Sequence, residues 1–311
     1  MFNTVHRRVA AGSASGFDVW TTQAAESGPH VVVLGGVHGD ETQGPLAAGR
    51  LAAGPTRLIR GSIDIVPVCH EAAFAADSRT NPTDNGNLAR VFPGDIDGGP
   101  TAQLAHHLYT EVLAGADLLI DLHTSGQSHD MPLLAGYQAD TAATGSLAQQ
   151  AASVFGADFV WRHPGRSEGR TVSVVDQAIY VECPGAGPMT LASVDTYATG
   201  VLRVLAMMGM LADSPPPSHL TPLRVTGGGN LDQDMVSVDQ VGLFVTDLAG
   251  GSKVDAGQLM GAVMTTDGQV LEELYAPFDA WVMALKRRPP VTPGDLVICL
   301  ATADSSAEDL H

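Results

Sequence analysis

The chain has few cysteines and no long apolar run. Its three cysteines, Cys69, Cys183 and Cys299, are odd in number and far apart, so neither a disulfide framework nor a C-x-x-C metal knuckle is available. We expect all three to be reduced and buried. No stretch reaches the roughly 18–20 apolar residues that span a bilayer, and the N-terminus lacks the apolar core of a secretory signal. The sequence therefore predicts a cytoplasmic protein without a membrane partner.

Basic residues are also scarce. Lysine and arginine number 16 against 34 aspartate and glutamate residues, which gives a formal net charge of −18. This field repels phosphate backbones, and the chain has no basic patch, so we do not expect a nucleic-acid partner. A small anionic substrate would need specific arginines beside its pocket. The acidic, apolar-rich composition is compatible with a homo-oligomer, although the sequence identifies no interface.

Short apolar runs alternate with helix-like stretches over the first 212 residues. The expected strands are residues 30–34, 62–68, 116–122, 131–134 and 178–182. The expected helices are residues 42–51, 101–114, 146–155 and 195–211. Strands that alternate with helices indicate a mixed, mostly parallel sheet with helices on both faces. The sequence thus predicts an α/β fold.

A second unit is expected after residues 213–219, where three consecutive prolines prevent a helix from continuing and favour an extended linker. Residues 220–311 show alternation and turn residues without a helical period. A weak repeat suggests two turn-plus-strand units, and this segment resembles the biotinyl/lipoyl-like barrel-sandwich fold. Its hairpin tip carries Phe278 to Trp281 and no attachment lysine. We therefore predict an all-β barrel or sandwich module that is structural or forms a pocket wall.

The strongest functional signal is the stretch HVVVLGGVHGDE, residues 30–41. Val31 to Leu34 read as a strand buried on both faces, and a glycine turn then delivers His38 and Glu41 together. Functional groups in parallel sheets collect beyond the carboxyl ends of the strands. Imidazole and carboxylate are ligands that zinc accepts. The H-x-x-E pair therefore predicts two ligands of a zinc site.

A third ligand is expected from another strand end, because catalytic zinc keeps three protein ligands and one open position. His123 follows the apolar run 116–122 and precedes a turn. Asp121 lies two residues earlier on the same face of that strand, where it is placed to orient the His123 ring. We therefore predict one zinc ion per chain, held by His38, Glu41 and His123.

The chemistry of zinc-activated water also needs a base that is not a ligand. Glu182 is the candidate, because it closes the run 178–182 and precedes a Cys-Pro-Gly turn. A thiol nucleophile at Cys183 is a weaker hypothesis, since its side chain would point away from that of Glu182 and no activating partner is evident.

Four segments, GGVHGDE, NLARVFPG, IDLHTSG and IYVECPG, occur in this order. Together they resemble the succinylglutamate desuccinylase/aspartoacylase family, relatives of the zinc carboxypeptidases. The resemblance covers roughly residues 31–211, and a β-rich C-terminal module is also typical of the family. It implies a zinc-carboxypeptidase-like (phosphorylase/hydrolase-like) fold, with residues 1–212 as the catalytic domain. It also implies His38, Glu41 and His123 as zinc ligands and Glu182 as general acid/base.

The same resemblance assigns two arginines. Arg79 matches the position that polarises the scissile carbonyl and stabilises the oxyanion. Arg90 matches the one that pairs with a substrate carboxylate in a fork geometry. The chain departs from the family at Ala89, where relatives commonly carry asparagine. Asn87, two residues earlier, is a candidate to supply the missing amide to the substrate.

These observations predict a zinc-dependent amidohydrolase that deacylates a small N-acyl amino acid or derivative. Two alternatives stay open, namely a metallocarboxypeptidase acting on short peptides and a non-catalytic binding module. The acyl group and the amine portion are not specified by the sequence, and Ala89 means that the usual family substrate does not follow.

Overall fold

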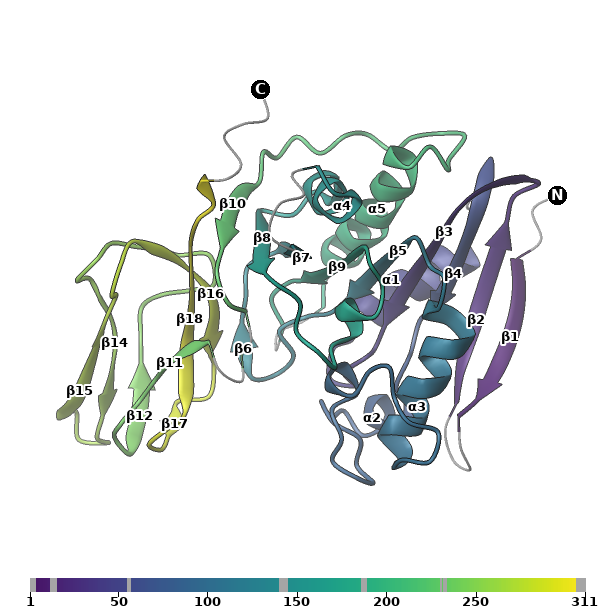
Figure 1. The fold of residues 1–311 in the computed structure, drawn as a ribbon. Coiled ribbons are helices and arrows are strands. Elements are labelled where there is room, and N and C mark those ends of the chain that lie inside the picture. Colours follow the sequence, from purple (N-terminus) through teal and green to yellow (C-terminus); the bar gives the residue numbers. More distant parts are fainter. Residues whose placement is uncertain are drawn as a thin grey trace.

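Two β-sheets form the framework of the computed structural model, which describes residues 4–11, 16–54, 57–139, 145–185, 189–229, 231 and 234–305. Figure 1 shows one sheet crossing the molecule from the N-terminal strands to the C-terminal strands. Its fourteen strands are β1 (Thr4–Ala10), β2 (Gly16–Gln23), β3 (Glu26–Gly35), β4 (Arg60–Val66), β5 (Leu118–Leu122), β6 (His129–Asp130), β7 (Leu134–Ala139), β8 (Phe159–Pro164), β9 (Ala178–Glu182), β10 (Leu223–Thr226), β11 (Met235–Ser237), β13 (Lys253–Val254), β16 (Ala280–Lys286) and β18 (Leu296–Ala303). The smaller sheet contains β12 (Gly242–Val245), β14 (Leu259–Met264), β15 (Val270–Tyr275) and β17 (Pro290–Val291).

The larger sheet is mixed. Its main order is β1-β2-β4-β3-β5-β9-β7-β8-β10-β18-β16-β13. Strands β4, β3, β5 and β9 are parallel, whereas β7 pairs antiparallel with β9 and then runs parallel to β8 and β10. Both outer regions are antiparallel. The prediction of a mostly parallel sheet is therefore correct for most of the central strands and wrong for the edges, where the strands pair antiparallel.

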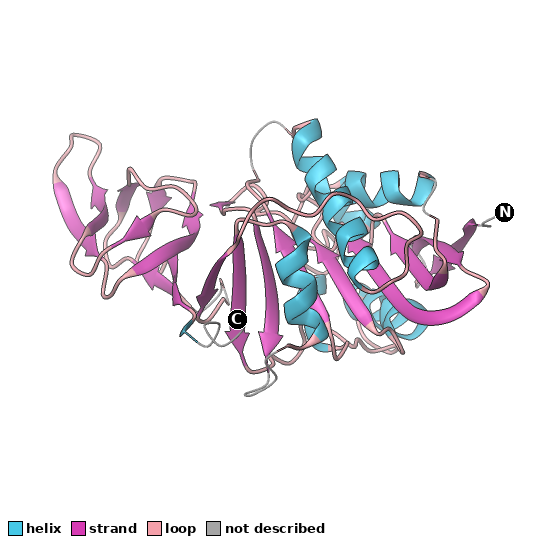
Figure 2. Cartoon of the chain, turned by 90° about the horizontal axis from the view of Figure 1, so that it is seen from above, coloured by secondary structure: helices cyan, strands magenta, loops and turns pink. Residues whose placement is uncertain are grey.

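Helices cover both faces of the central strands. They are α1 (Gln43–Ala53), α2 (Glu71–Ala75), α3 (Pro100–Leu108), α4 (Leu147–Phe155) and α5 (Leu191–Met207), with short turns η1 (Leu88–Arg90), η2 (Tyr109–Leu113) and η3 (Thr171–Ser173). The described α-helices gather over the part of the sheet that precedes β10 (Figure 2). Among the described residues, no helix is both long and apolar enough to cross a bilayer.

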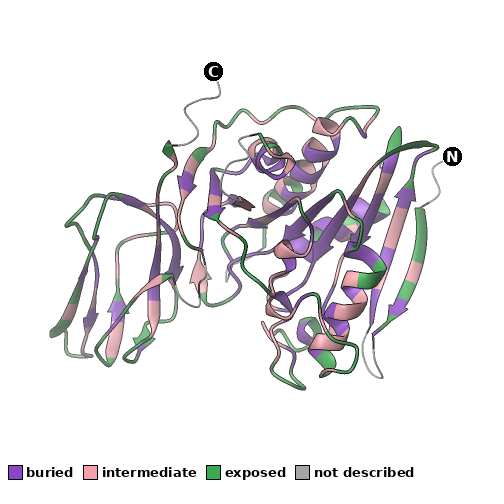
Figure 3. Ribbon diagram, in the orientation of Figure 1, coloured by how far each residue is buried: buried purple, intermediate pink, exposed green. Residues whose placement is uncertain are grey.

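The sequence of β3 is continuously apolar from Val31 to Leu34 because both faces of the strand are buried. Val31 and Val33 enter the core beneath α1, α4 and α5, whereas Val32 and Leu34 enter the core on the opposite face beneath α3. All four side chains are fully buried, because successive strand residues point to opposite faces. Figure 3 shows the same burial along the central strands and exposure at the edge strand β1.

The strand predictions are confirmed for β3, β4, β5 and β9 within a few residues. The prediction for residues 131–134 is wrong, because the strand begins at Leu134 and continues to Ala139. Its sequence, LAGYQA, has no apolar run that would mark it. Strands β1, β2 and β8 are not predicted by the sequence, since they have polar or mixed sequences; β1 pairs with the adjacent β2, whereas β2 and β8 also pair with strands further along the chain.

Helix boundaries differ more. Thr190 caps α5 by accepting a hydrogen bond from the Ser193 amide at 3.1 Å, so this helix begins before the predicted residue 195. It ends at Met207, ahead of the predicted residue 211, because Gly209 adopts a φ of +68°. The predicted helix 146–155 is confirmed as α4 with Ser146 as its cap. The predicted helix 101–114 divides into α3 and the π-turn η2.

The C-terminal segment continues the larger sheet. Residues 214–218 have no helix or strand, and β10 then pairs in parallel with β8. Strand β6, from the first part of the chain, pairs with β16 of the last part. Hydrogen bonding therefore crosses the predicted boundary at residues 213–219 in two places. The division at that boundary remains a prediction.

A partly buried ion pair between β3 and β4 gives a testable pH dependence. Asp64 accepts hydrogen bonds from Thr21 and from His30, whose Nε2 lies 3.2 Å away. The hydrogen bond to Asp64 raises the pKa of His30 above 6.5 although burial opposes it. Burial acts to raise the pKa of Asp64, but the bonds from His30 and Thr21 lower it below 3.8.

We expect Asp64→Asn to lower the free energy of unfolding by about 1–2 kcal/mol near pH 5, and by less at pH 8. Because the pKa of His30 is raised in the folded state, protonated His30 stabilises the fold fully below pH 6.5. This contribution is lost as the pH rises through the raised pKa. Because the pKa of Asp64 is lowered in the folded state, ionised Asp64 stabilises the fold fully above pH 3.8. This contribution is lost as the pH falls through the lowered pKa. Urea denaturation at both pH values measures this. Thr21→Val is the control, and we expect it to lower the free energy of unfolding equally at pH 5 and pH 8. If Asp64→Asn lowered the free energy of unfolding equally at both pH values, the ion pair would be contradicted.

Candidate metal centre

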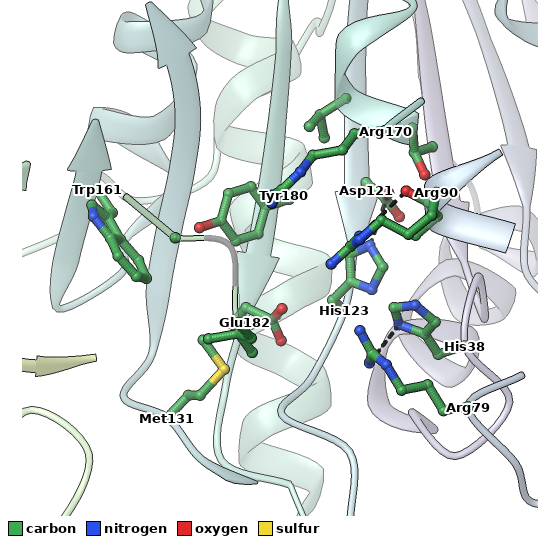
Figure 4. A pocket seen from close by; sticks show the side chains of 15 residues that line it. His38, Arg79, Arg90, Asp121, His123, Met131, Trp161, Arg170, Tyr180 and Glu182 are labelled. Atoms are coloured by element: carbon green, nitrogen blue, oxygen red, sulfur yellow. Dashed lines mark hydrogen bonds and ion pairs between the residues drawn. The ribbon is translucent and has the colours of Figure 1, made fainter. Parts of the chain in front are cut away.

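The carboxyl ends of three neighbouring parallel strands bring the predicted residues together. In the sheet, Gly35 of β3 pairs with Leu122 of β5, and Leu122 pairs with Val181 of β9. His38, His123 and Glu182 follow these three residues closely and meet at one edge (Figure 4). Gly44 allows this approach, because a Cβ atom there would lie 2.2 Å from the Leu122 carbonyl oxygen. The start of α1 therefore seats directly against the end of β5.

His38, Glu41 and His123 form one buried cluster. Nδ1 of His38 lies 2.7 Å from one Glu41 oxygen, and Nδ1 of His123 lies 2.8 Å from the other. One ligand atom from each residue falls within 4.8 Å of the others. The three side chains are at most 7% exposed. Two nitrogens and a carboxylate thus converge on a single point.

The opposite ring nitrogens are held by other groups. Nε2 of His38 lies 3.1 Å from Asn87 Oδ1, and Nε2 of His123 lies 2.9 Å from Asp121 Oδ2. When Nε2 carries the hydrogen toward these acceptors, each Nδ1 presents its lone pair toward Glu41. The Thr124 amide also donates to Glu41 at 3.0 Å. The donor set and its orientation fit a divalent cation such as zinc.

The electrostatics of the cluster also favour a cation. Burial raises the pKa of the Glu41 carboxyl, but the two histidines outweigh it and hold that pKa well below 4.5. Burial lowers the pKa of His38. Burial acts the same way on His123, yet Asp121 and Glu41 raise its pKa well above 6.5. Two buried carboxylates around His123 therefore demand a positive charge, either a proton or a metal ion.

Glu182 lies in the same cavity without joining the cluster. Its Oε2 is buried and has no hydrogen-bond partner among the described residues. Burial, with the charge of Glu41 adding to it, raises the pKa of Glu182 to about 8. A bound cation would lower that value. The carboxylate is therefore free to take up and release a proton near neutral pH.

Three arginines are among the described residues that line the cavity, which is open to solvent on one side. Arg79 places Nη1 3.1 Å from His38 Nδ1 and 3.2 Å from Glu41 Oε1. Arg90 also lines the cavity, as the sequence predicts, and Arg170 joins it from the segment before β9 (Figure 4). The cavity is therefore strongly basic at one end although the protein is acidic.

The side-chain oxygen of Asn87 contacts other groups of the protein. Its Oδ1 accepts a hydrogen bond from the Ala89 amide at 3.0 Å and lies against His38 Nε2. It is not one of the described residues that line the cavity, whereas the methyl group of Ala89 is. Asn87 therefore caps the η1 turn and contacts a predicted ligand, His38.

Sequence reasoning missed several lining residues. Arg170, Trp161 and Tyr180 line the cavity, and so do Gly229 and Leu231 from the C-terminal segment. The scarcity of basic residues makes every arginine a candidate, but it does not distinguish Arg170 from the others. Tyr180 occupies a strand already predicted, two residues before Glu182 and on the same face. Trp161 is brought to the cavity by the pairing of β8 with β7, and Gly229 and Leu231 follow β10, which pairs with β8.

The fold and the cluster define an α/β protein with a candidate metal centre where its parallel strands end. Residues 27–208 match the model of the succinylglutamate desuccinylase/aspartoacylase catalytic domain, and the chain belongs to this family. It is 30% identical over 293 residues to the N-alpha-acetyl-L-2,4-diaminobutyric acid deacetylase of Halomonas elongata, covering 88% of this chain and 82% of that protein.

Solved structures agree with this assignment. The succinylglutamate desuccinylase/aspartoacylase of Rhodobacter sphaeroides superposes with a TM-score of 0.83 at 25% identity, covering 97% of this chain and 95% of its own. The product-bound ectoine utilization protein EutE (DoeB) of Ruegeria pomeroyi gives 0.81 at 26% identity, with the same coverage. The whole chain, including its β-rich C-terminal part, therefore has the fold of these relatives.

Proposed function

We propose that this protein is a zinc-dependent amidohydrolase that removes the acyl group from a small N-acyl amino acid or derivative. The observation that carries the proposal is the convergence of two oriented imidazoles and one carboxylate beside the unpartnered carboxylate of Glu182. The deacetylase of Halomonas elongata supports the reaction class and an acetyl group as the first acyl group to test.

His38, Glu41 and His123 would hold one zinc ion per chain. When bound, zinc supplies a Lewis acid that polarises the amide carbonyl and lowers the pKa of water. Glu182 takes the proton from the attacking water and returns it to the departing amine. Arg79, beside the cluster, shares the negative charge of the tetrahedral intermediate. Each protein group thus has one role, and the proton passes through Glu182.

We assign substrate binding to the part of the cavity that Arg90 and Arg170 line. Arg90 and Arg170 are placed to pair with the carboxylate of an amino acid, which a planar guanidinium binds through two parallel hydrogen bonds. Asn87 and Asp121 are assigned to orient the two histidine ligands, since each contacts an Nε2 atom. The assignment moves Asn87 from the substrate to the metal centre.

The C-terminal segment is proposed to act as a barrel-sandwich module that closes the cavity. One apolar core joins its two sheets, with Phe244 and Val263 from the smaller sheet packed against Val282 and Ile298 from the larger. Gly229 and Leu231 extend from this segment into the cavity lining. This module therefore contributes to substrate selection rather than carrying a cofactor.

The proposal is tested by elemental analysis of protein prepared without chelator, followed by an assay of acetyl- and succinyl-amino acids beside dipeptides. We expect close to one zinc per chain and hydrolysis of at least one N-acyl amino acid. Preferential cleavage of dipeptides would favour the metallocarboxypeptidase. Protein without bound metal and without turnover after zinc loading would favour a non-catalytic binding module.

A further inference from the structure

A second polar group faces the cavity from the wall that β7, β8 and β9 form. Tyr180 and Trp161 both line the cavity, and both are paired with Gly136 in the sheet, so the three residues form one row across β9, β7 and β8. Directly paired residues share a face of the sheet. In Figure 4 the Tyr180 hydroxyl points toward Trp161, and Arg170 lies on the other side of the ring.

The hydroxyl group of Tyr180 is fixed by His163. The Tyr180 oxygen lies 2.7 Å from His163 Nε2. Nδ1 of His163 contacts the carbonyl oxygens of Gly227, at 3.2 Å, and Gly228. Carbonyl oxygens only accept hydrogen bonds, so Nδ1 carries the hydrogen of the ring. Burial lowers the pKa of His163 to about 4, which keeps the ring neutral at physiological pH.

This tautomer determines the direction of the next hydrogen bond. A neutral imidazole with its hydrogen on Nδ1 has only a lone pair on Nε2, so the Tyr180 hydroxyl must donate to it. Burial raises the pKa of Tyr180 well above 10, so the phenol stays protonated. Its single hydrogen is used by His163. The oxygen therefore offers only acceptor lone pairs to a ligand in the cavity.

Two glycines make room for this pair of rings. A Cβ atom on Gly136 would lie 2.1 Å from Tyr180 Cε1, and one on Gly229 would lie 2.3 Å from His163 Cε1. The Tyr180 ring thus lies across β7, and the loop after β10 lies against His163. The acceptor orientation is therefore set by three strands and by a loop of the C-terminal segment.

We propose that Tyr180 is a specificity-determining residue that selects a substrate whose side chain ends in a hydrogen-bond donor, above all a primary ammonium group. The oxygen accepts from that group, and the ring faces of Tyr180 and Trp161 attract its positive charge. Arg90 and Arg170, which also line the cavity, pair with the substrate carboxylate. The inference rests on the proposed deacylase function, whose scissile amide lies beside Glu182.

Spacing along β9 supports a side chain of moderate length. Tyr180 precedes Glu182 by two residues, which places their Cα atoms roughly 7 Å apart. A substrate that presents its amide to Glu182 reaches Tyr180 with a side chain of a few carbon atoms. An apolar or carboxylate-ended side chain of the same length would leave the acceptor oxygen without a partner or repel it.

The test compares Nα-acetyl-2,4-diaminobutyrate with Nα-acetylnorvaline, which replaces the side-chain ammonium by a methyl group. With zinc-loaded protein at neutral pH, we expect kcat/KM to favour the ammonium substrate by about tenfold to a hundredfold, mainly through KM. Tyr180→Phe should reduce that preference to within a few-fold, because it weakens binding of the ammonium substrate and removes the oxygen that norvaline leaves without a partner. Tyr137→Phe, a buried tyrosine of β7 outside the cavity lining, is the matched control.

The role of His163 as a positioning residue is tested with the same pair of substrates. His163→Leu should weaken the ammonium preference without slowing norvaline hydrolysis, whereas a merely structural role would lower both rates. His163→Gln should restore the preference, because one amide can donate to the glycine carbonyls and accept from Tyr180.

Equal rates for both substrates, or an equal loss for both in Tyr180→Phe, would overturn the assignment. If the wild-type protein hydrolyses no N-acyl amino acid, the proposed function fails separately. Calorimetric titration with free 2,4-diaminobutyrate and norvaline then decides the subsite: tighter binding of the diamine that Tyr180→Phe abolishes supports it, and equal binding refutes it.

Discussion

Glu182→Gln is expected to lower kcat by about 100-fold to 10,000-fold while zinc stays bound. The amide has nearly the same shape as the carboxylate but cannot take a proton from water or return it to the amine. Glu182 is not one of the residues of the His38–Glu41–His123 cluster that would hold the ion, and its Oε2 has no hydrogen-bond partner among the described residues. Steady-state kinetics with parallel zinc determination measures both quantities.

A second readout separates this effect from misfolding. In metal-free protein the raised pKa of Glu182, about 8, means that the folded state keeps a proton which the unfolded state releases near 4.5. Wild-type stability therefore falls as the pH rises between these values, and the glutamine variant should lose that contribution. Glu168→Gln, an exposed change in a nearby loop, is the matched control with normal turnover. Near-normal turnover in zinc-loaded Glu182→Gln would show the mechanism to be wrong.

Glu41→Gln is expected to remove zinc binding and, with it, hydrolysis. Both carboxylate oxygens face an imidazole nitrogen, at 2.7 and 2.8 Å, so a neutral amide turns an N–H group toward one of them. The charge that attracts the cation is lost at the same time. We expect zinc affinity to fall by more than about 100-fold, the upper range for residues that only orient a ligand. Competition with a chromogenic chelator measures the affinity.

Asp121→Asn is the graded control for this prediction. Asp121 orients His123 without contacting the converging Nδ1 atoms, so its loss should weaken zinc binding by about tenfold to a hundredfold. Chelation should lower the melting temperature of the wild type and leave that of Glu41→Gln unchanged, because only the wild type gains stability from bound metal. Zinc binding of Glu41→Gln at wild-type affinity would rule out the proposed ligand set.

The sequence predicts the central strands and the ligand cluster for the same reason. Apolar runs such as residues 31–34 mark strands buried on both faces, and polar residues directly after them must lie at the carboxyl edge of a parallel sheet. His38, Glu41, His123 and Glu182 could therefore be selected without knowing how the strands pair. Arg79 and Arg90 came from motif resemblance, and the structure places both at the cavity.

Asn87 shows the limit of such patterns. Its distance from Ala89 in sequence is two residues, but its orientation depends on the η1 turn, where its side chain accepts from the Ala89 amide. A loop residue can face either way until the turn is known. The prediction that Asn87 contacts the substrate rested only on its position two residues before Ala89. In the structure, the η1 turn directs the Asn87 side-chain oxygen to His38.

The sequence by itself thus selected the proposed reacting groups, because donor type and position after a strand are local properties. The tertiary structure alone decided how those groups are oriented and what faces them. Asn87 contacts His38 across 49 residues, and His163 binds the Gly228 carbonyl across 65 residues. No local pattern encodes such contacts, since the first forms only when the η1 turn packs against the loop after β3, and the second only when β8 and β10 pair. The proposed metal chemistry can therefore be predicted from the sequence. The proposed selection of an ammonium group depends on the tertiary contacts that orient Tyr180 and His163.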